Sequence, residues 1–235
     1  AAQKILHWKT EIEGGKVEAD YIDYHNNHIL LVSINEGAGE IIVRCDGEVE
    51  TNDTAGIMGR HGGHVPLWYF LRPTALTEPT REIQALARSA VVEGDDLLAT
   101  LHALSTKVLA AVQYDIGHTD SATTADAALA AGHGVCQDHA HVFIAAARSL
   151  GIPARYVSGY LMLTDRVEQE ASHAWAEAHV EGLGWVGFDI SNGISPDLRY
   201  VRVATGADYA EAAPISGISF GGGEQSMVVS LAVEQ

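Results

Sequence analysis

One of the two cysteines in the chain stands where its thiol would be reactive. Cys136 follows Gly134 and begins a segment whose apolar residues recur at helical spacing. They are Ala140, Phe143, Ile144, Ala147 and Leu150, the pattern of a helix with one buried face. A helix N-terminus stabilises negative charge and lowers the pKa of a thiol placed there. We therefore expect Cys136 to be a nucleophile; the alternative is a core cysteine that packs as a small hydrophobe.

A nucleophilic thiol needs a base that takes its proton and a third group that orients the base. His139 and His141 follow the thiol on its own helix and are poorly aimed at the sulfur. His173 instead begins an expected strand at 172–180, in which every second residue is alanine, so that a helix can pack closely on one face. The other face carries the larger side chains: His173, Trp175, Glu177 and His179. His173 is therefore the expected base.

The orienting carboxylate follows from the hairpin that 172–180 is expected to form with 185–189. Directly opposite residues of an antiparallel hairpin have a constant index sum, and a glycine-rich turn centred on Glu181 places Asp189 opposite His173. A slip of one residue would send Asp189 to the other face. The alternative is an ordinary surface pair. The same register predicts two further pairs: Trp175 with Gly187, and Glu177 with Trp185.

The helix that starts at Cys136 is the last of four expected helices and ends before Pro153. Asp95 and Thr124 are suited to cap the second and third. The first three helices are expected at 82–91, 95–112 and 124–131. Strands are expected after them at 154–163, 172–180, 185–189 and 226–233.

The first part of the chain reads as β structure. Short alternating segments at 7–12, 19–24, 28–34 and 40–46, separated by turn residues, predict a meander or a small sandwich. Residues 52–64 read as a loop, in which His61 and His64 lack a third nearby metal ligand. An aromatic and proline-rich connector at 66–79 leads to the first helix.

The composition limits the classes of partner. Among 235 residues, 14 Lys and Arg stand against 31 Asp and Glu, and the net charge of −17 argues against nucleic acid and anionic membranes. No apolar run approaches the length of a membrane span. Two cysteines are too few for a disulfide framework, so a reducing, cytoplasmic location is expected. The chain opens Ala-Ala-Gln-Lys, which suggests a trimmed piece of something longer.

Four sequence blocks resemble the bacterial transglutaminase-like cysteine protease family. They are GVCQDHAH at 134–141, LGIPARYVSGY at 150–160, SHAWAE at 172–177 and GWVGFD at 184–189. The resemblance spans about residues 80–205 and implies an α+β, papain-like transglutaminase core, with a cysteine at a helix N-terminus packed on an antiparallel sheet. It implies a Cys136–His173–Asp189 triad and acyl transfer through a thioester, with water or an amine as acceptor. Residues 1–78 are then expected to be a β-rich N-terminal domain, and 79–235 the catalytic core.

Two positions depart from the pattern of that family. Related sequences usually have further β structure ahead of residues 4–8, so the N-terminal domain is expected to be incomplete. An aromatic residue, commonly Phe, usually stands where this chain has His139. The second departure leaves the triad intact and adds a titratable group just below it.

Several residues are candidates for supporting roles. The backbone N–H of Cys136 would donate to an oxyanion, and Tyr114 is a candidate second donor. Asp138 would either serve there or hold the loop together. Tyr160 and Trp175 would be cleft walls or core residues. The polar loop at 164–171 is expected to recognise a cationic group of the substrate or to be a plain connector.

Three readings of the function remain open at this stage. Hydrolysis of a peptide or protein amide is favoured, because water is always available and no amine pocket is visible. The alternatives are a cross-linking transglutaminase and a non-catalytic binding module of the same fold. A zinc site would have to combine Cys136 with His139 or His141; we expect no metal and no cofactor.

Overall fold

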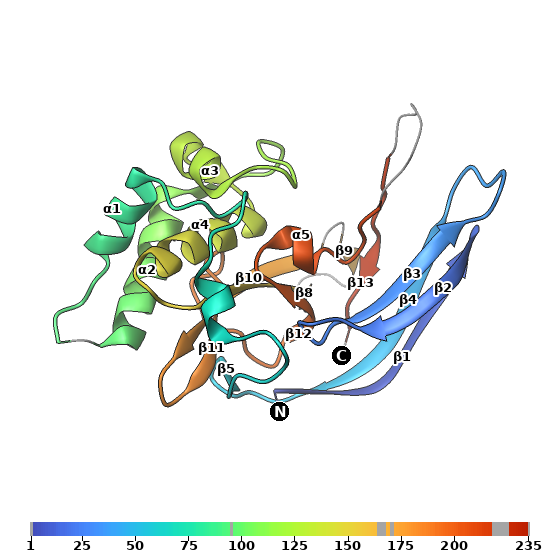
Figure 1. Cartoon of the computed structure of the whole chain (residues 1–235), viewed down its shortest axis with the longest axis horizontal. Helices are drawn as coiled ribbons and strands as arrows, with labels where there is room; N and C mark the ends of the chain where they lie inside the picture. The colour runs from blue at the N-terminus through green and yellow to red at the C-terminus, as the bar shows by residue number, and fades with distance from the viewer. Residues whose placement is uncertain (1, 95, 164–167, 170–171, 218–225, 235) are drawn as a thin grey trace.

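A buried helix and an antiparallel sheet form the centre of the protein. The computed structural model describes residues 2–94, 96–163, 168–169, 172–217 and 226–234. Helix α4 (Cys136–Ser149) is enclosed by α1 (Arg81–Ser89), α2 (Leu97–Ala111) and α3 (Ala125–Ala131) on one side and by the sheet on the other (Figure 1). This arrangement confirms the expected fold class, with a cysteine at the start of a helix that packs on an antiparallel sheet.

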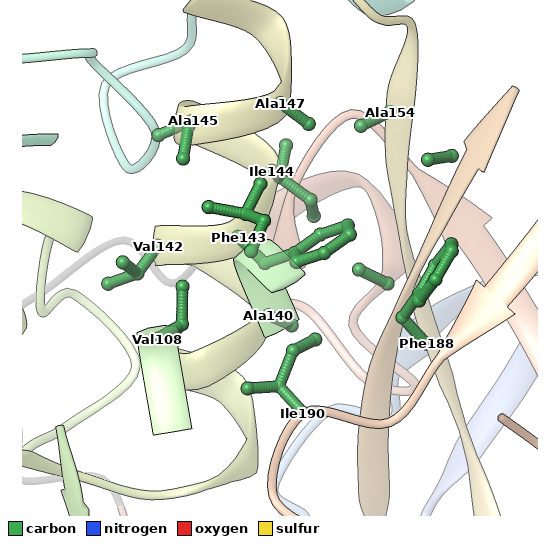
Figure 2. Packing of buried hydrophobic residues seen from close by; sticks show 14 of the residues in the cluster. Val108, Ala140, Val142, Phe143, Ile144, Ala145, Ala147, Ala154, Phe188 and Ile190 are labelled. Carbon is green, nitrogen blue, oxygen red and sulfur yellow. The ribbon is translucent and has the colours of Figure 1, made fainter. Parts of the chain in front are cut away.

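The alanine face of β10 (His173–Val180) brings the sheet close to α4. Ala174, Ala176 and Ala178 are buried in the same apolar cluster as the helix. Phe143 of α4 stacks on Phe188 with 5.1 Å between ring centroids, in the core shown in Figure 2. Small residues on the strand therefore leave room for large ones on the helix, as expected from the alternation.

The central sheet has five antiparallel strands in the order β12-β8-β10-β11-β5. Their bounds are Tyr200–Gly206 (β12), Ala154–Leu161 (β8), His173–Val180 (β10), Gly184–Phe188 (β11) and Ile57–Gly59 (β5). Strand β12 is missing from the sequence expectations because a register shift between Arg202 and Ala204 interrupts its alternation. Strand β5 comes from the segment that was expected to be a loop.

The helix caps follow the expected chemistry. Asp96 caps α2, since its carboxylate accepts from the backbone N–H of Ala99 at 2.9 Å, and the expected cap Asp95 lies outside the described residues. Thr124 caps α3 as expected, accepting from Ala127 N–H at 3.2 Å. Gly132 ends α3 with φ at +70°, a conformation that favours glycine.

The N-terminal strands form one long bent hairpin instead of the expected meander or sandwich. Strand β1 (Gln3–Glu13) pairs with β4 (Ile42–Thr51), and β2 (Gly15–Ile22) pairs with β3 (His28–Ile34). The pairing is nested because β2, the turn at 23–27 and β3 lie between β1 and β4 in the chain. The chain also reverses near Gly14, so that Gln3 and Asn27 both reach β12. Figure 1 shows these strands on the far side of the molecule from α1, α2 and α3.

The tip of this hairpin is fastened to the core. The side chain of Asn27 donates to Thr205 O at 2.8 Å and accepts from Thr205 N–H at 2.9 Å, as a neighbouring strand would. His25 is paired with Glu211 of helix α5 (Tyr209–Ala212) at 2.8 Å. A domain boundary near residue 78 stays a prediction, and β5 reaches across it into the central sheet.

The remaining elements are short. They are the 3-10 helix η1 (Leu67–Leu71) and the strands β6 (Gln113–Tyr114), β7 (His133–Gly134), β9 (Glu168–Gln169) and β13 (Leu231–Ala232). Of the strand expected at 226–233, only β13 forms, paired with β9. The loop expected at 164–171 lies outside the described residues except for β9. None of the described helices has the length and apolar character needed to cross a membrane.

Candidate active site

Cys136 is the first residue of α4, as expected, and is half-buried with a free thiol. Asp138 holds the turn before it, since its Oδ2 accepts from Val135 N–H at 2.8 Å and from Thr119 Oγ1 at 2.7 Å. A Cβ on Gly134 would lie 2.6 Å from the Cβ of Asp138, so only glycine fits there. Asp138 thus has the loop-holding role that was one of its two expected roles, and the thiol is presented on an ordered turn.

His173 and Asp189 are in direct contact. His173 Nε2 donates to Asp189 Oδ2 at 2.6 Å, and the Asp189 side chain is fully buried. Cys136 lies close enough to His173 to contribute to its raised pKa, and both residues line one cleft. The structure therefore brings together the three residues that were selected from the sequence.

The register that led to Asp189 is nevertheless wrong by two residues. Glu177 pairs with Gly187 and His179 with Trp185, so Trp175 does not face Gly187 and Asp189 lies diagonally from His173. The turn has three residues and is centred on Gly182, whose φ of +84° glycine readily adopts. The face of Asp189 was still correct, because a shift of two residues preserves the alternation of a strand.

Two further side chains hold Asp189 in place. Tyr200 Oη donates to Asp189 Oδ2 at 2.6 Å, and Asn192 Nδ2 donates to the same oxygen at 2.7 Å. The backbone N–H of Asn192 donates to Oδ1 at 3.2 Å. Neither Tyr200 nor Asn192 is among the residues predicted from the sequence. The Asp-Ile-Ser-Asn-Gly turn was a signal for Asn192, whereas Tyr200 arrives on the unexpected strand β12.

The electrostatics of the site favour an ion pair between the imidazolium of His173 and the carboxylate of Asp189. Burial alone would lower the pKa of His173, but hydrogen bonds and charges from Asp189 and Cys136 outweigh burial and raise its pKa to about 10. Burial would raise the pKa of Asp189, and its bonds to His173, Asn192 and Tyr200 lower it instead. At neutral pH His173 is therefore an imidazolium held between a carboxylate and the thiol.

A cleft of about 380 Å³ opens over these residues. Its lining combines apolar and polar side chains: Tyr114, Cys136, Leu161, Leu163, Ser172, His173, Ser191 and Asn192. Tyr114 stands on β6 and lines the cleft. Burial and the charges of Cys136 and Asp189 raise the pKa of Tyr114, so its hydroxyl keeps its proton.

Tyr160 and Trp175 are not among the described residues that line this cleft. Trp175 is 2% exposed and packs with Val157, Leu161 and Tyr200. The ring of Trp175 lies 6.2 Å from that of His173, so it supports the histidine from within the core. Tyr160 lies toward the N-terminal hairpin, where burial and the nearby Cys45 raise its pKa.

Two further histidines considered in the sequence, His61 and His141, have partners in the fold. His61 Nε2 donates to Val65 O at 2.6 Å, and its Nδ1 accepts from Trp185 Nε1 at 3.1 Å. His141 is buried, and its Nε2 accepts from the backbone N–H of Tyr209 at 3.2 Å. Among the residues described, no three His, Cys, Asp or Glu side chains converge in a way that could hold a metal ion.

Comparison with known proteins places part of the chain in a family. Residues 84–190 match the transglutaminase-like superfamily core. An uncharacterized protein of Mycobacterium tuberculosis is 33% identical over 168 residues, covering 67% of this chain and 52% of that protein. One of Mycobacterium leprae is 32% identical over 164 residues, covering 68% and 58%. The chain thus spans a little over half the length of the curated relatives it matches.

A solved structure extends the likeness to the whole chain. The crystal structure of a candidate cysteine protease from Cytophaga hutchinsonii superposes with a TM-score of 0.74, covering 100% of this chain and 81% of that one. The two sequences are 24% identical, so this comparison shows a shared fold. The resemblance seen in the sequence blocks is confirmed: over residues 84–190 the chain belongs to the transglutaminase-like superfamily.

Proposed function

We propose that this protein is a cysteine-dependent acyl-transfer enzyme that hydrolyses amide bonds of peptides or proteins. The observation that carries the proposal is that Cys136 and His173 line one open cleft, with His173 hydrogen-bonded to the buried Asp189. A nucleophile, a base and an orienting carboxylate in this order are what covalent acyl transfer requires.

In the first half of the reaction the thiolate of Cys136 attacks the amide carbonyl carbon. The carbonyl π electrons move to the oxygen, and the backbone N–H of Cys136, which has no partner within the helix at this position, donates to that oxyanion. Tyr114 is the second proposed donor, since its protonated hydroxyl belongs to the cleft lining. His173 then gives its Nδ1 proton to the leaving amine, the C–N bond breaks, and a thioester remains on Cys136.

In the second half His173 acts as the base. It takes a proton from a water molecule, whose oxygen attacks the thioester carbonyl carbon. Collapse of the second oxyanion breaks the C–S bond, releases the carboxylic acid and restores the thiolate beside an imidazolium. Asp189 stays ionised throughout and holds the ring of His173 by its Nε2–H. An amine in place of water would give cross-linking, the alternative outcome of the same thioester.

The two cysteines provide an internal test of thiol activation. At pH 6 iodoacetamide is expected to alkylate Cys136 at least about tenfold faster than Cys45, because a helix N-terminus and the imidazolium of His173 both favour a thiolate. Cys45 is exposed on β4, away from a helix N-terminus and from His173. Accessibility alone would therefore predict that Cys45 reacts faster than Cys136. Mass mapping of the folded protein measures both rates.

The control for this prediction is the same labelling in guanidinium chloride. Both cysteines are then expected to react at similar rates, because the helix and the histidine no longer act on the thiol. Equal rates in the folded protein would contradict an activated Cys136.

The cleft also predicts which acyl groups are accepted. Apart from the pair Cys136 and His173, the described residues that line it are uncharged, and Leu161 and Leu163 contribute an apolar part. A peptide panel that varies the residue donating the scissile carbonyl is therefore expected to give at least about tenfold higher kcat/KM for Leu or Gln than for Asp or Lys, since a buried unpaired charge is costly.

The products of that panel separate the two reactions. Mass spectrometry with an added primary amine detects either the free acid or the amine adduct of each substrate. Mainly free acid supports hydrolysis, whereas mainly adduct would replace hydrolysis by cross-linking. Equal turnover of charged and uncharged substrates would contradict the selectivity.

A further inference from the structure

His139 is a fully buried residue whose two ring nitrogens both have partners. Nε2 lies 2.8 Å from the backbone oxygen of Val112, and Nδ1 lies 2.8 Å from Ser191 Oγ. Because a carbonyl oxygen only accepts hydrogen bonds, Nε2 must carry the proton, and in the neutral ring Nδ1 accepts from the hydroxyl of Ser191. Burial lowers the pKa of His139, which keeps this neutral form at neutral pH.

One of these partners lines the cleft, and the other lies two residues before a residue that lines it. Val112 is followed by β6, and the ring of its Tyr114 lies 6.1 Å from the ring of His139. Ser191 lines the cleft and precedes Asn192, which donates to Asp189 Oδ2. His139 itself stands three residues after Cys136 on α4, about one helical turn below the thiol.

We propose that His139 is a positioning residue that holds the Asp189–Asn192 turn and the Tyr114 wall at a fixed place relative to Cys136. It acts through Ser191 and through the backbone of Val112 and is buried away from the substrate. This inference rests on the proposed function. It gives a physical role to His139, at a position where related sequences commonly have an aromatic residue such as phenylalanine. A phenylalanine would fill the space but would form no hydrogen bond with Ser191 or with the backbone of Val112.

The test is a double-mutant cycle with His139→Phe and Ser191→Ala. Each variant removes the hydrogen bond from one end, so their effects should not add. We expect each single variant to lower kcat about ten- to a hundredfold with little change in KM, because a small displacement of the reacting groups is costly. The double variant should be no slower than His139→Phe. Additive losses, or a rise in KM with kcat unchanged, would overturn the inference.

A second measurement needs no substrate. The alkylation rate of Cys136 is followed from pH 4 to 10. In both single variants we expect the rate to rise at a higher pH than in the unmodified protein, because the His173–Asp189 pair is held less firmly. Unchanged pH profiles in both variants would overturn the positioning role. Absent turnover in the unmodified protein would instead overturn the proposed function, so the two failures are distinguishable.

His141→Phe is the matched control. His141 lies on the same helix, is equally buried, and contacts the ring of Tyr156 and the backbone of Tyr209 instead of the cleft walls. This variant is expected to lower thermal stability, because the N–H of Tyr209 loses its acceptor, and to keep the alkylation profile of the unmodified protein. A shifted profile in His141→Phe would show that loss of packing in α4 is sufficient, and would contradict a specific role of His139.

Discussion

Replacing Asp189 with asparagine is expected to lower kcat by about three to four orders of magnitude while the protein keeps its fold. The asparagine amide has nearly the same shape, so Tyr200 and Asn192 can still reach an oxygen at this position. It cannot balance the charge of an imidazolium, and the raised pKa of His173 depends on Asp189. Initial rates on a peptide substrate and near-ultraviolet circular dichroism measure activity and packing in the same samples.

Asp197→Asn is the matched control for this prediction. Asp197 lies in the connection that leads to β12 and pairs with Arg199 at 2.6 Å, and its side chain is partly exposed. Its pKa is lowered mainly by hydrogen bonds from Arg199, without contact to His173. We expect Asp197→Asn to turn over substrate at a rate close to that of the unmodified protein. Activity of Asp189→Asn within tenfold of the unmodified protein would contradict the orienting role of Asp189.

The largest expected loss of stability comes from Glu177, which has no part in the proposed chemistry. Its fully buried carboxylate binds Arg155 with Nε–Oε2 at 2.7 Å and Nη2–Oε2 at 2.6 Å, and Arg202 Nε lies 3.2 Å from Oε1. The guanidinium of Arg155 also lies 4.0 Å over the ring of Trp185. Glu177→Gln removes the charge that these two cations face, and breaking a buried pair in this way costs about 3–5 kcal/mol of unfolding free energy.

Urea denaturation measures this loss, and pH changes it in a defined direction. Burial would raise the pKa of Glu177, but Arg155 and Arg202 lower it overall, so the ion pairs stabilise the folded protein above the ordinary pKa of 4.5. This stabilisation is lost as the pH falls through the lowered pKa, and the difference between unmodified and variant protein should shrink there. Glu11→Gln, the same change at an exposed pair with Lys9, is expected to change little. Equal stabilities at neutral pH would contradict the prediction.

Local sequence patterns were sufficient for the elements that carry the candidate triad. The helical spacing after Cys136 and the alanines of β10 are properties of short segments, and both reappear in the structure. The face of Asp189 followed from the two-residue period of a strand. The register did not, because it depends on whether Gly182 adopts a left-handed conformation within a three-residue turn.

The parts that could not be predicted depend on distant residues. Tyr200 reaches Asp189 only because β12 joins the sheet beside β8 with an irregular register. The N-terminal strands could pair in several ways, and the alternation of apolar and polar residues does not tell which strands become partners. The nested pairs β1–β4 and β2–β3 therefore could not be predicted. The role of His139 likewise needs Ser191, which lies 52 residues away in the chain.

Strand β5 has a consequence for the order in which the chain can fold. It pairs with β11, and the surrounding side chains of Val65 and Phe70 pack on Trp185 of that strand. On a ribosome β5 would emerge about 125 residues before its partner, which at roughly 5–20 residues per second is a delay of about 6–25 seconds. During that interval the nascent chain carries an unpaired strand and an uncovered aromatic residue, both of which attract chaperones and neighbouring chains. Completion of the sheet is therefore a late step in the synthesis of this part of the chain, and the site that depends on β11 assembles only when two segments about 125 residues apart meet.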